Sequence, residues 1–376
     1  MAIYLGLMSG TSLDGVDAAL VEFDDSADAE RGLRLALLGH LHRPMPPALQ
    51  TELAALNNAG GDNELHRSAL AGNGVAGLYA DAALALLVQC GIDGSKVRAI
   101  GAHGQTVRHR PGEFDGIGYT VQLLNGALLA ERCGIDVVCD LRSRDVAAGG
   151  QGAPLVPAFH AALLGRPGVA QAVLNLGGIA NLSLLRADGG VGGFDCGPAN
   201  GLMDVWAQRH LGTGYDVDGA WASSGQVDAA LLSRLLSEPY FGRAPPKSTG
   251  RDLFNADWLD ARLTGASLAP LDVQATLAEL TARSASDALR RHLPAAQSLL
   301  VCGGGALNGH LMRRLQALLP GLMVSSTQLE GIDPMQVEAL AFAWLAKAHC
   351  ACVAGNRPEV TGASGLRVLG ALYPGR

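Results

Sequence analysis

The chain has 376 residues, 48% of them hydrophobic and 17% charged, so it is long enough for two domains and apolar enough for large buried cores. Its formal net charge of −7 provides no basic surface of the kind that binds nucleic acid or an anionic membrane. The seven cysteines are scattered without a Cys-x-x-Cys pair, which indicates reduced thiols and not a zinc site. With no basic leader before the first apolar residues, we expect a cytoplasmic protein.

The first half of the chain alternates patterns typical of strands and of helices. Alternating or continuous apolar runs indicate strands, and apolar residues spaced at i, i+3 and i+4 indicate helices. In chain order we predict a hairpin over 2–23, a strand over 33–44, helices over 47–56 and 66–91, a buried strand over 97–104, a strand running into a helix over 119–134, a strand over 135–145, and a glycine-rich loop running into a helix over 147–163.

The second half opens with the same unit as the first: residues 172–187 again predict strand, glycine turn, strand. Because strands alternate with helices throughout, the fold class is α/β. We place a domain boundary at 135–136, giving domains 1–135 and 136–376, and the C-terminal tail is compatible with packing back on the first domain. The remaining predicted elements are a strand ending at Phe194-Asp195 followed by a helix, helices over 226–238 and 270–292, a strand, triple glycine and helix over 298–318, a helix over about 335–352, and a strand-like tail.

Three glycine-rich turns are candidates for binding phosphate: Ser9–Gly15, Gly177–Asn181 and Gly303–Gly305. The sequence has neither a P-loop nor a GxGxxG motif after its first strand, but consecutive amides in a glycine turn can still form an anion-binding nest. The first turn also carries hydroxyls and the carboxylates of Asp14 and Asp17, which could reach a magnesium ion through water. The alternative for each turn is a plain hairpin connection.

Several polar residues outside the turns are candidates for chemistry. Asp195 ends a predicted strand, where open α/β sheets place ligands, and could serve as the base of a phosphoryl transfer; the alternative is a helix cap or an Asx turn. The polar residues 103–106 follow a predicted strand and are a second candidate for a functional strand end. The alternative is that the histidine at 103 has only a structural role. Arg142 and Arg144 could bind an anionic substrate or lie on a solvated face, and Asp218 is a further candidate.

Ten stretches, in order along nearly the whole chain, carry a family resemblance: "GLMSGTSLDGVDAALVEF", "GAHGQTVRH", "LLAERCGIDVVCDLRSRDVAAGGQGAPLVPAFH", "LNLGGIANLS", "GFDCGPANGLMD", "YDVDGAWASSG", "PPKSTGRDLFN", "DVQATLAELTA", "VCGGGALN" and "VEALAFAWLA". They resemble the anhydro-N-acetylmuramic acid kinases of the sugar kinase, heat-shock ATPase and actin superfamily. The resemblance implies a two-domain actin-like ATPase fold with an active-site cleft between the domains.

The resemblance also implies a reaction. Water adds to C1 of 1,6-anhydro-N-acetylmuramic acid and opens the anhydro bridge, while O6 takes the γ-phosphoryl group of ATP; the products are N-acetylmuramic acid 6-phosphate and ADP, in cell-wall recycling. ATP and Mg²⁺ are the implied cofactors, and a homodimer without nucleic-acid or membrane partners is expected. The alternatives are an ordinary sugar kinase of the same superfamily and, from another class, a nucleotide-gated regulator, which the absence of a basic patch or helix-turn-helix pattern disfavours.

Carried over position by position, the resemblance assigns roles to several of the candidate residues. Asp195 matches the aspartate that activates the water, and Glu338 matches an acidic residue near the nucleotide and metal. The sugar would be surrounded by Gln105, Thr106 and Arg142 or Arg144, since an arginine suits its lactyl carboxylate. The resemblance matches Gly10, Thr11, Ser12, Leu13, Asp14, Gly15, Val16 and Asp17 to the family's ATP phosphate loop. The layout of the other two glycine turns, and not the resemblance, places Gly177, Gly178 and Asn181 at the phosphates and Gly304, Gly305 and Asn308 near the adenosine.

Two places depart from the family pattern. Leu124 and Asn125 stand where glycine and aspartate are usual, so a charge that could orient the substrate is missing. Cys196 and Ala199 stand where threonine and glycine are common, and we expect them to be tolerated packing changes.

Overall fold

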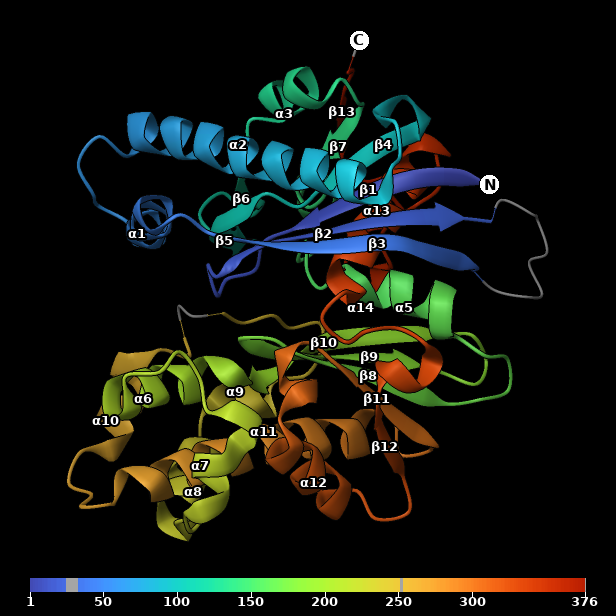
Figure 1. Ribbon diagram of the computed structural model, residues 1–376. Helices are drawn as coiled ribbons and strands as arrows, with labels where there is room; N and C mark the ends of the chain where they lie inside the picture. Colours follow the sequence, from blue (N-terminus) through green and yellow to red (C-terminus); the bar gives the residue numbers. More distant parts are fainter. Residues whose placement is uncertain (25–32, 251–252, 376) are drawn as a thin grey trace. The chain divides into compact units, whose positions relative to one another are not determined.

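A computed structural model describes residues 1–24, 33–250 and 253–375 (Figure 1). The chain forms two compact units. The first consists of Met1–Leu164 together with Glu338–Arg376, and the second is the continuous segment Gly165–Val337. The first unit is therefore built from both ends of the chain.

The first unit contains a six-stranded mixed sheet in the order β13-β7-β4-β1-β2-β3. Strands β1 to β3 are antiparallel, whereas β4 runs parallel to β1 and β7 parallel to β4. A separate two-stranded sheet pairs β5 with β6. The strand bounds are β1 Ala2–Met8, β2 Gly15–Phe23, β3 Leu35–Pro44, β4 Val97–Ala102, β5 Gln105–Pro111, β6 Gly118–Leu123, β7 Val137–Cys139 and β13 Ala371–Tyr373.

The second unit contains a five-stranded sheet in the order β10-β9-β8-β11-β12. Strands β8 to β10 are antiparallel, and β11 and β12 continue the sheet in parallel from β8. The strand bounds are β8 Gln171–Leu176, β9 Ile179–Leu185, β10 Val191–Pro198, β11 Ser298–Cys302 and β12 Met323–Ser326.

The two sheets share one topology. In each unit the first three strands form an antiparallel meander, and the fourth and fifth strands extend the sheet in parallel from the first. The predicted return of the opening hairpin in the second half is therefore one part of a larger repeat. This duplicated sheet agrees with the predicted α/β class and two-domain, actin-like architecture.

Helices cover both faces of the first sheet. The longest, α2, packs against β2 and β3 and buries Val75, Tyr79 and Leu86 completely. Among the described residues it is also the one helix long and apolar enough to cross a membrane, but 61% of that apolar window is buried in the protein. The helix bounds are α1 Pro47–Leu56, α2 Glu64–Cys90, η1 Gly94–Lys96, α3 Gly126–Cys133, α4 Ser143–Ala147, α5 Val156–Leu164, α13 Val337–Cys350 and α14 Pro358–Thr361.

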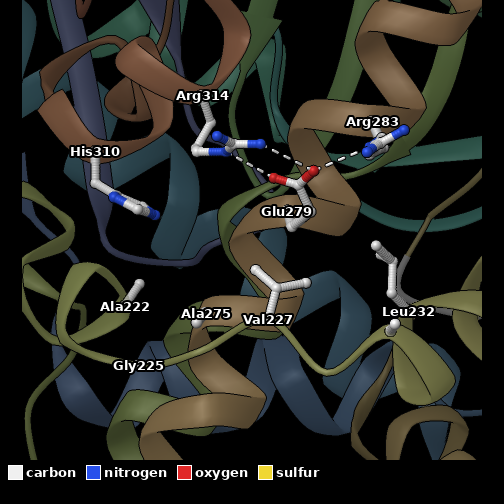
Figure 2. Close-up of a pocket in the computed structure, with 10 residues that line it drawn as sticks. Ala222, Gly225, Val227, Leu232, Ala275, Glu279, Arg283, His310 and Arg314 are labelled. Atoms are coloured by element: carbon white, nitrogen blue, oxygen red, sulfur yellow. Dashed lines mark hydrogen bonds and ion pairs between the residues drawn. The ribbon is translucent and has the colours of Figure 1, made fainter. Parts of the chain in front are cut away.

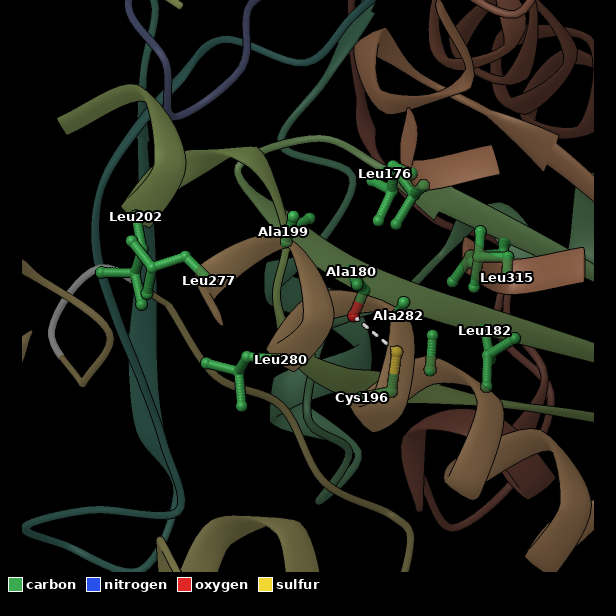
Figure 3. Packing of buried hydrophobic residues seen from close by; sticks show 14 of the residues in the cluster. Leu176, Ala180, Leu182, Cys196, Ala199, Leu202, Leu277, Leu280, Ala282 and Leu315 are labelled. Carbon is green, nitrogen blue, oxygen red and sulfur yellow. Dashed lines mark hydrogen bonds between the residues drawn. The ribbon is translucent and has the colours of Figure 1, made fainter. Parts of the chain in front are cut away.

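The core of the second unit forms between its sheet and α11, which starts with a proline in its first turn and ends with three basic residues, as helix termini favour. Figure 3 shows Cys196 and Ala199 among the leucines of this core, so both departures from the family pattern are buried packing positions, as expected. The helix bounds are α6 Asn200–Leu211, η2 Val217–Gly219, α7 Ala220–Ser224, α8 Ala229–Leu236, α9 Pro239–Gly242, α10 Ala256–Leu263, α11 Pro270–His292, η3 Gly304–Leu307, α12 Gly309–Leu318 and η4 Thr327–Glu330.

The division of the chain differs from the predicted boundary at 135–136. Residues 136–164 belong to the first unit because β7 adds to its sheet beside β4. Residues 338–376 belong there as well, because β13 pairs with β7. The tail therefore packs back on the first unit, but the second unit is shorter at both ends than the predicted 136–376.

Three local predictions also need correction. The strand predicted over 135–145 is limited to β7, since residues 143–147 form the short helix α4. Strand β5 follows directly after Gly104, where only a polar strand end was predicted. Strand β10 does not end at Asp195 but continues to Pro198, with a bulge between Asp195 and Gly197.

Candidate active site

The first glycine turn joins β1 to β2 in the first unit. The amide of Leu13 donates to the carbonyl of Gly10 over 3.3 Å, and the Asp14 carboxylate accepts from Ser12 Oγ at 2.5 Å and from the Gly15 amide at 3.1 Å. Thr11, Ser12 and Asp14 are exposed, whereas Leu13, Gly15 and Val16 are buried. A Cβ on Gly10 would approach nothing nearer than Ser12 Oγ at 3.5 Å, so protein packing does not explain this glycine. The open space beside an exposed turn is what a phosphate group would require.

A small network of hydrogen bonds holds the start of this turn. Ser9 Oγ and the hydroxyl of Tyr79 lie 2.7 Å apart, and each lies 3.2 Å from the carbonyl oxygen of Gly104, so one hydroxyl donates to the other and the second donates to that carbonyl. Gln105 Nε2 donates to the carbonyl of Gly10 at 3.0 Å. The predicted sugar residue Gln105 is thus tied to the predicted phosphate turn, which brings two sequence motifs together.

Asp17 has a different environment from the rest of the turn. Its carboxylate lies 3.0 Å from His42 Nδ1 and 3.3 Å from His40 Nε2. All three side chains project from adjacent strands of the meander, since Asp17 pairs directly with His42. Asp17 is therefore engaged by protein groups, while Asp14 is the exposed carboxylate of the turn.

The two candidate arginines also differ. The guanidinium of Arg142 donates to His103 Nε2 at 3.1 and 3.0 Å and to the carbonyl of Gly152 at 2.8 Å. Arg144, on α4, is exposed. Thr106, at the start of β5, is half-buried and accepts a hydrogen bond from Gln122 at 3.2 Å.

The second glycine turn, between β8 and β9, contacts the start of α6. The carbonyls of Gly177 and Gly178 accept hydrogen bonds from the amides of residues 199–201 over 3.0–3.1 Å. Asn200 Nδ2 donates to the carbonyl of Leu176 at 2.8 Å and lies 3.6 Å from where a Cβ on Gly304 would stand. The second turn and the triple-glycine loop are therefore neighbours around Asn200, a residue that the sequence did not single out.

A row of polar side chains crosses the second sheet beside that turn. Asn175 on β8 pairs with Asn181 on β9, and Asn181 pairs with Asp195 on β10. Residues paired directly across strands share one face of a sheet, so the three side chains lie on the same face. The Oδ1 atoms of both asparagines are buried without a hydrogen-bond partner. Asn175 was not predicted; its signal was the first asparagine in "LNLGGIAN", two residues before the glycines.

Asp195 is 8% exposed and is held by α9 and by the segment that follows this helix. Its Oδ2 accepts from the amide of Thr249 at 2.9 Å, its carbonyl accepts from the hydroxyl of Tyr240 at 2.7 Å, and its amide donates to the carbonyl of Lys247. Helix α6 begins after Ala199, and no side chain caps it. The helix-cap alternative for Asp195 is therefore wrong.

Lys247 is a buried cation that sequence reasoning missed. It is 8% exposed, donates to the carbonyl of Tyr240 at 3.1 Å, and lies over the rings of Tyr240 and Phe194. Burial lowers its pKa from the ordinary value of 10.5, although Cys196 and Asp195 act in the opposite direction. The available signal was a lysine inside a loop of prolines, serine and threonine.

Two further candidates act as caps. Asn308 Oδ1 accepts from the amide of Leu311 at 3.0 Å and starts α12. Asp218 has a positive φ of 57° and accepts from the amide of Gly309 at 2.7 Å, so it supports the same helix start. In the first unit, Asn125 likewise caps α3 through Leu128 and donates to Asn73 at 2.8 Å, so the departure at this position keeps a capping side chain.

Figure 2 shows a pocket of about 470 Å³ between α7, α8, α11 and α12 of the second unit. Its polar side is the buried Glu279, which accepts from Arg314 and Arg283 at 2.8–3.2 Å. Burial alone would raise the pKa of Glu279, but the hydrogen bonds from the arginines outweigh it and hold the pKa below the ordinary 4.5. None of the predicted site residues lines this pocket.

A magnesium ion would find few direct protein ligands. Among the described residues, no group of three or more His, Cys, Asp or Glu side chains is arranged to hold a metal. Mg²⁺ commonly keeps several waters and binds one or two carboxylates together with phosphate oxygens, and Asp14 is an exposed carboxylate of the first glycine turn. Glu338 is half-buried and directly precedes Ala339, whose carbonyl closely approaches Gly6 on β1.

In each unit the sheet opens with an antiparallel hairpin whose turn is rich in glycine, and the two sheets share one topology. The sequence pattern of the anhydro-N-acetylmuramic acid kinase family matches residues 2–375. The chain is 58% identical to the anhydro-N-acetylmuramic acid kinase of Variovorax paradoxus over 99% of both chains, and 54% identical to that of Pseudomonas putida over 100% of both. The chain belongs to this family. Among solved structures, the activator of 2-hydroxyisocaproyl-CoA dehydratase from Clostridium difficile is 11% identical, with a TM-score of 0.47 over 91% of this chain and 92% of that one.

Proposed function

We propose that this protein is an ATP-dependent kinase that hydrolytically opens 1,6-anhydro-N-acetylmuramic acid and phosphorylates O6, in the recycling of cell-wall peptidoglycan. The observation that carries the proposal is family membership across residues 2–375.

In the proposed reaction, Asp195 takes a proton from a water molecule as the water oxygen bonds to C1. The C1–O6 bond breaks, and O6 attacks the γ-phosphorus of ATP as ADP leaves. The anhydrosugar has no free hydroxyl at O6, so a base acting on water is chemically necessary. The nucleophilic O6 is generated where it is used, which is a proximity effect.

Each unit contributes a glycine turn to phosphate binding in this proposal. The ATP contacts are Gly10 to Asp17 in the first unit, Gly177, Gly178 and Asn181 in the second, and Gly304, Gly305 and Asn308 near the adenosine. The buried, unpartnered Oδ1 of Asn181 supports a polar ligand or water at that turn. When bound, Mg²⁺ would neutralise charge on the phosphates, with Asp14 and Glu338 as the carboxylates proposed to hold its water shell.

For the substrate we propose contacts from Gln105, Thr106 and Arg144. Arg144 is the better partner of the lactyl carboxylate, because Arg142 already donates to two protein acceptors whereas Arg144 is exposed. A homodimer in the cytoplasm remains part of the proposal, and light scattering of the purified protein tests the dimer.

The proposal is tested by turnover in ¹⁸O-water with the anhydrosugar, ATP and magnesium, read early by mass spectrometry because the anomeric oxygen exchanges slowly. We expect a 6-phosphosugar with one heavy oxygen at C1. Asp195→Asn should lower kcat by about 10²–10⁴-fold. Asp188→Asn removes an exposed carboxylate from the turn between β9 and β10 and is the matched control. Phosphorylation of free sugars without attack on the anhydrosugar would instead indicate an ordinary sugar kinase.

A further inference from the structure

His103 lies between the two motifs that we assign to ATP and to the sugar in the first unit. Its amide donates to the carbonyl of Leu7 at 3.0 Å, which fixes the backbone beside β1. On one side its Nδ1 lies 3.2 Å from the carbonyl oxygen of Ser9, and on the other its Nε2 accepts two hydrogen bonds from Arg142. The ring is 5% exposed and packs 4.8 Å from the ring of Phe342.

The hydrogen bonds determine the state of the imidazole. Arginine has only donors, so Nε2 must be the nitrogen without a proton. Nδ1 therefore carries the proton and donates it to Ser9, whose carbonyl is an acceptor. Burial, and then the charge of Arg142, lower the pKa of His103 to about 3, so the ring is neutral at physiological pH.

The far side of Arg142 is equally fixed. Its Nη1 donates to the carbonyl of Gly152 at 2.8 Å, and the amide of Gly152 donates to the buried Asp145 at 2.8 Å. Asp145 also accepts from Asn356 and Thr361, each at 2.8 Å, which anchors this loop to the C-terminal part of the unit. Arg142 is thus a link within the protein and joins His103 to the glycine-rich loop next to Arg144.

We propose that His103 is a positioning residue that fixes the phosphate turn, Ser9–Gly15, relative to the glycine-rich loop that contains Gly152. It donates from Nδ1–H to Ser9 and accepts at Nε2 from Arg142. The proposal rests on the proposed function, in which these two segments meet ATP and the anhydrosugar. The neutral imidazole thus fixes two backbone carbonyls. It contacts the carbonyl of Ser9 directly and the carbonyl of Gly152 through the guanidinium of Arg142.

Two substitutions of His103 separate its two contacts. Asparagine places its amide near the position of Nδ1 and cannot reach Arg142, whereas glutamine extends its carboxamide toward the position of Nε2 and gives up the bond to Ser9. We expect His103→Asn to raise KM for the sugar, and His103→Gln to raise KM for ATP, each about three- to tenfold, with the other KM close to wild type. His160→Gln is the matched control, because His160 is also fully buried in this unit, on α5, with its pKa lowered to about 3 by burial.

A measurement on the unsubstituted protein completes the test and needs no activity. Long-range ¹H–¹⁵N spectra of histidine-labelled protein at pH 7 should show His103 as a neutral ring in the Nδ1–H form, with signals that disappear in both His103 variants. The signals of His349, whose Nδ1 lies 2.7 Å from the carbonyl oxygen of Leu369, should remain. A neutral Nε2–H ring or an imidazolium at His103 would overturn the proposal, as would equal changes of both KM values in the two variants. If the wild-type enzyme does not use the anhydrosugar, the proposed function fails, while the tautomer and ATP binding still test His103.

Discussion

Acid should destabilise the first unit through its two buried, neutral histidines. His103 and His160 each have a folded pKa of about 3 against an ordinary value of 6.5. Between these values the unfolded chain binds a proton that the folded chain excludes, so the free energy of unfolding falls as pH falls through this window. Above pH 6.5 both states are neutral, and the histidines contribute nothing to the pH dependence.

The size of the effect follows from the two pKa values. Going from pH 7 to pH 5, each histidine should cost about 2 kcal/mol of unfolding free energy. Carboxylates also titrate in this range, but they cancel when the wild type is compared with a variant that lacks one histidine. His160→Gln should therefore show a loss between pH 7 and pH 5 that is about 2 kcal/mol smaller than the wild-type loss.

Urea unfolding followed by circular dichroism at pH 7, 6 and 5 provides the measurement. The quantity to compare is the change with pH within each protein, because the glutamine lowers stability at all pH values by disturbing packing. Parallel pH profiles for wild type and variant would refute the argument, since they would mean that His160 titrates alike in the folded and unfolded chains.

The remaining predictions concern packing and charge. Gly6→Ala should lower the free energy of unfolding by about 3 kcal/mol or more, because the new Cβ would overlap the carbonyl of Ala339. Gly10→Ala should lower it by less than about 1 kcal/mol but raise KM for ATP about tenfold. Thermal melts measure the loss of stability, and steady-state kinetics measure the change in KM. Glu279→Gln should lower the free energy of unfolding by about 2–3 kcal/mol, because it breaks the bonds of a buried carboxylate to two partly exposed arginines. Asp260→Asn breaks an exposed ion pair and should lower the free energy of unfolding by less than about 1 kcal/mol. Equal losses for the two variants in urea titrations would contradict this ranking.

Predictions from the sequence were most accurate for elements whose structure depends on residues close together along the chain. The two hairpins, α1 and α11 follow from local alternation, helical spacing and terminal residues, and their predicted positions agree with the structure. Domain membership could not be derived in this way, because the pairing of β13 with β7 joins segments more than 200 residues apart and leaves no local pattern. The predicted strand end at Asp195 failed because a bulge, which periodicity does not indicate, carries β10 onward.

In the candidate site, too, local features could be predicted from the sequence, whereas contacts between distant segments could not. Glycine turns are visible in the sequence, and so is a carboxylate beside Cys-Gly-Pro. The contacts that support them are not, since His103 meets Arg142 and Asp195 meets Thr249 across separations of 39 and 54 residues. Lys247 was missed for a related reason: only the fold reveals that its amine is buried.

The discontinuous first unit has a consequence for synthesis on the ribosome. Helix α13 lies directly on β1 and β4, where Gly6 and Gly101 allow its carbonyls to approach closely. Until residues 338–350 leave the exit tunnel, that face of the nascent sheet lacks α13. The intervening segment, Gly165–Val337, takes roughly 9 to 35 s to translate at roughly 5–20 residues per second. The second unit can therefore finish folding first, and the unit that begins the polypeptide is the last to be completed.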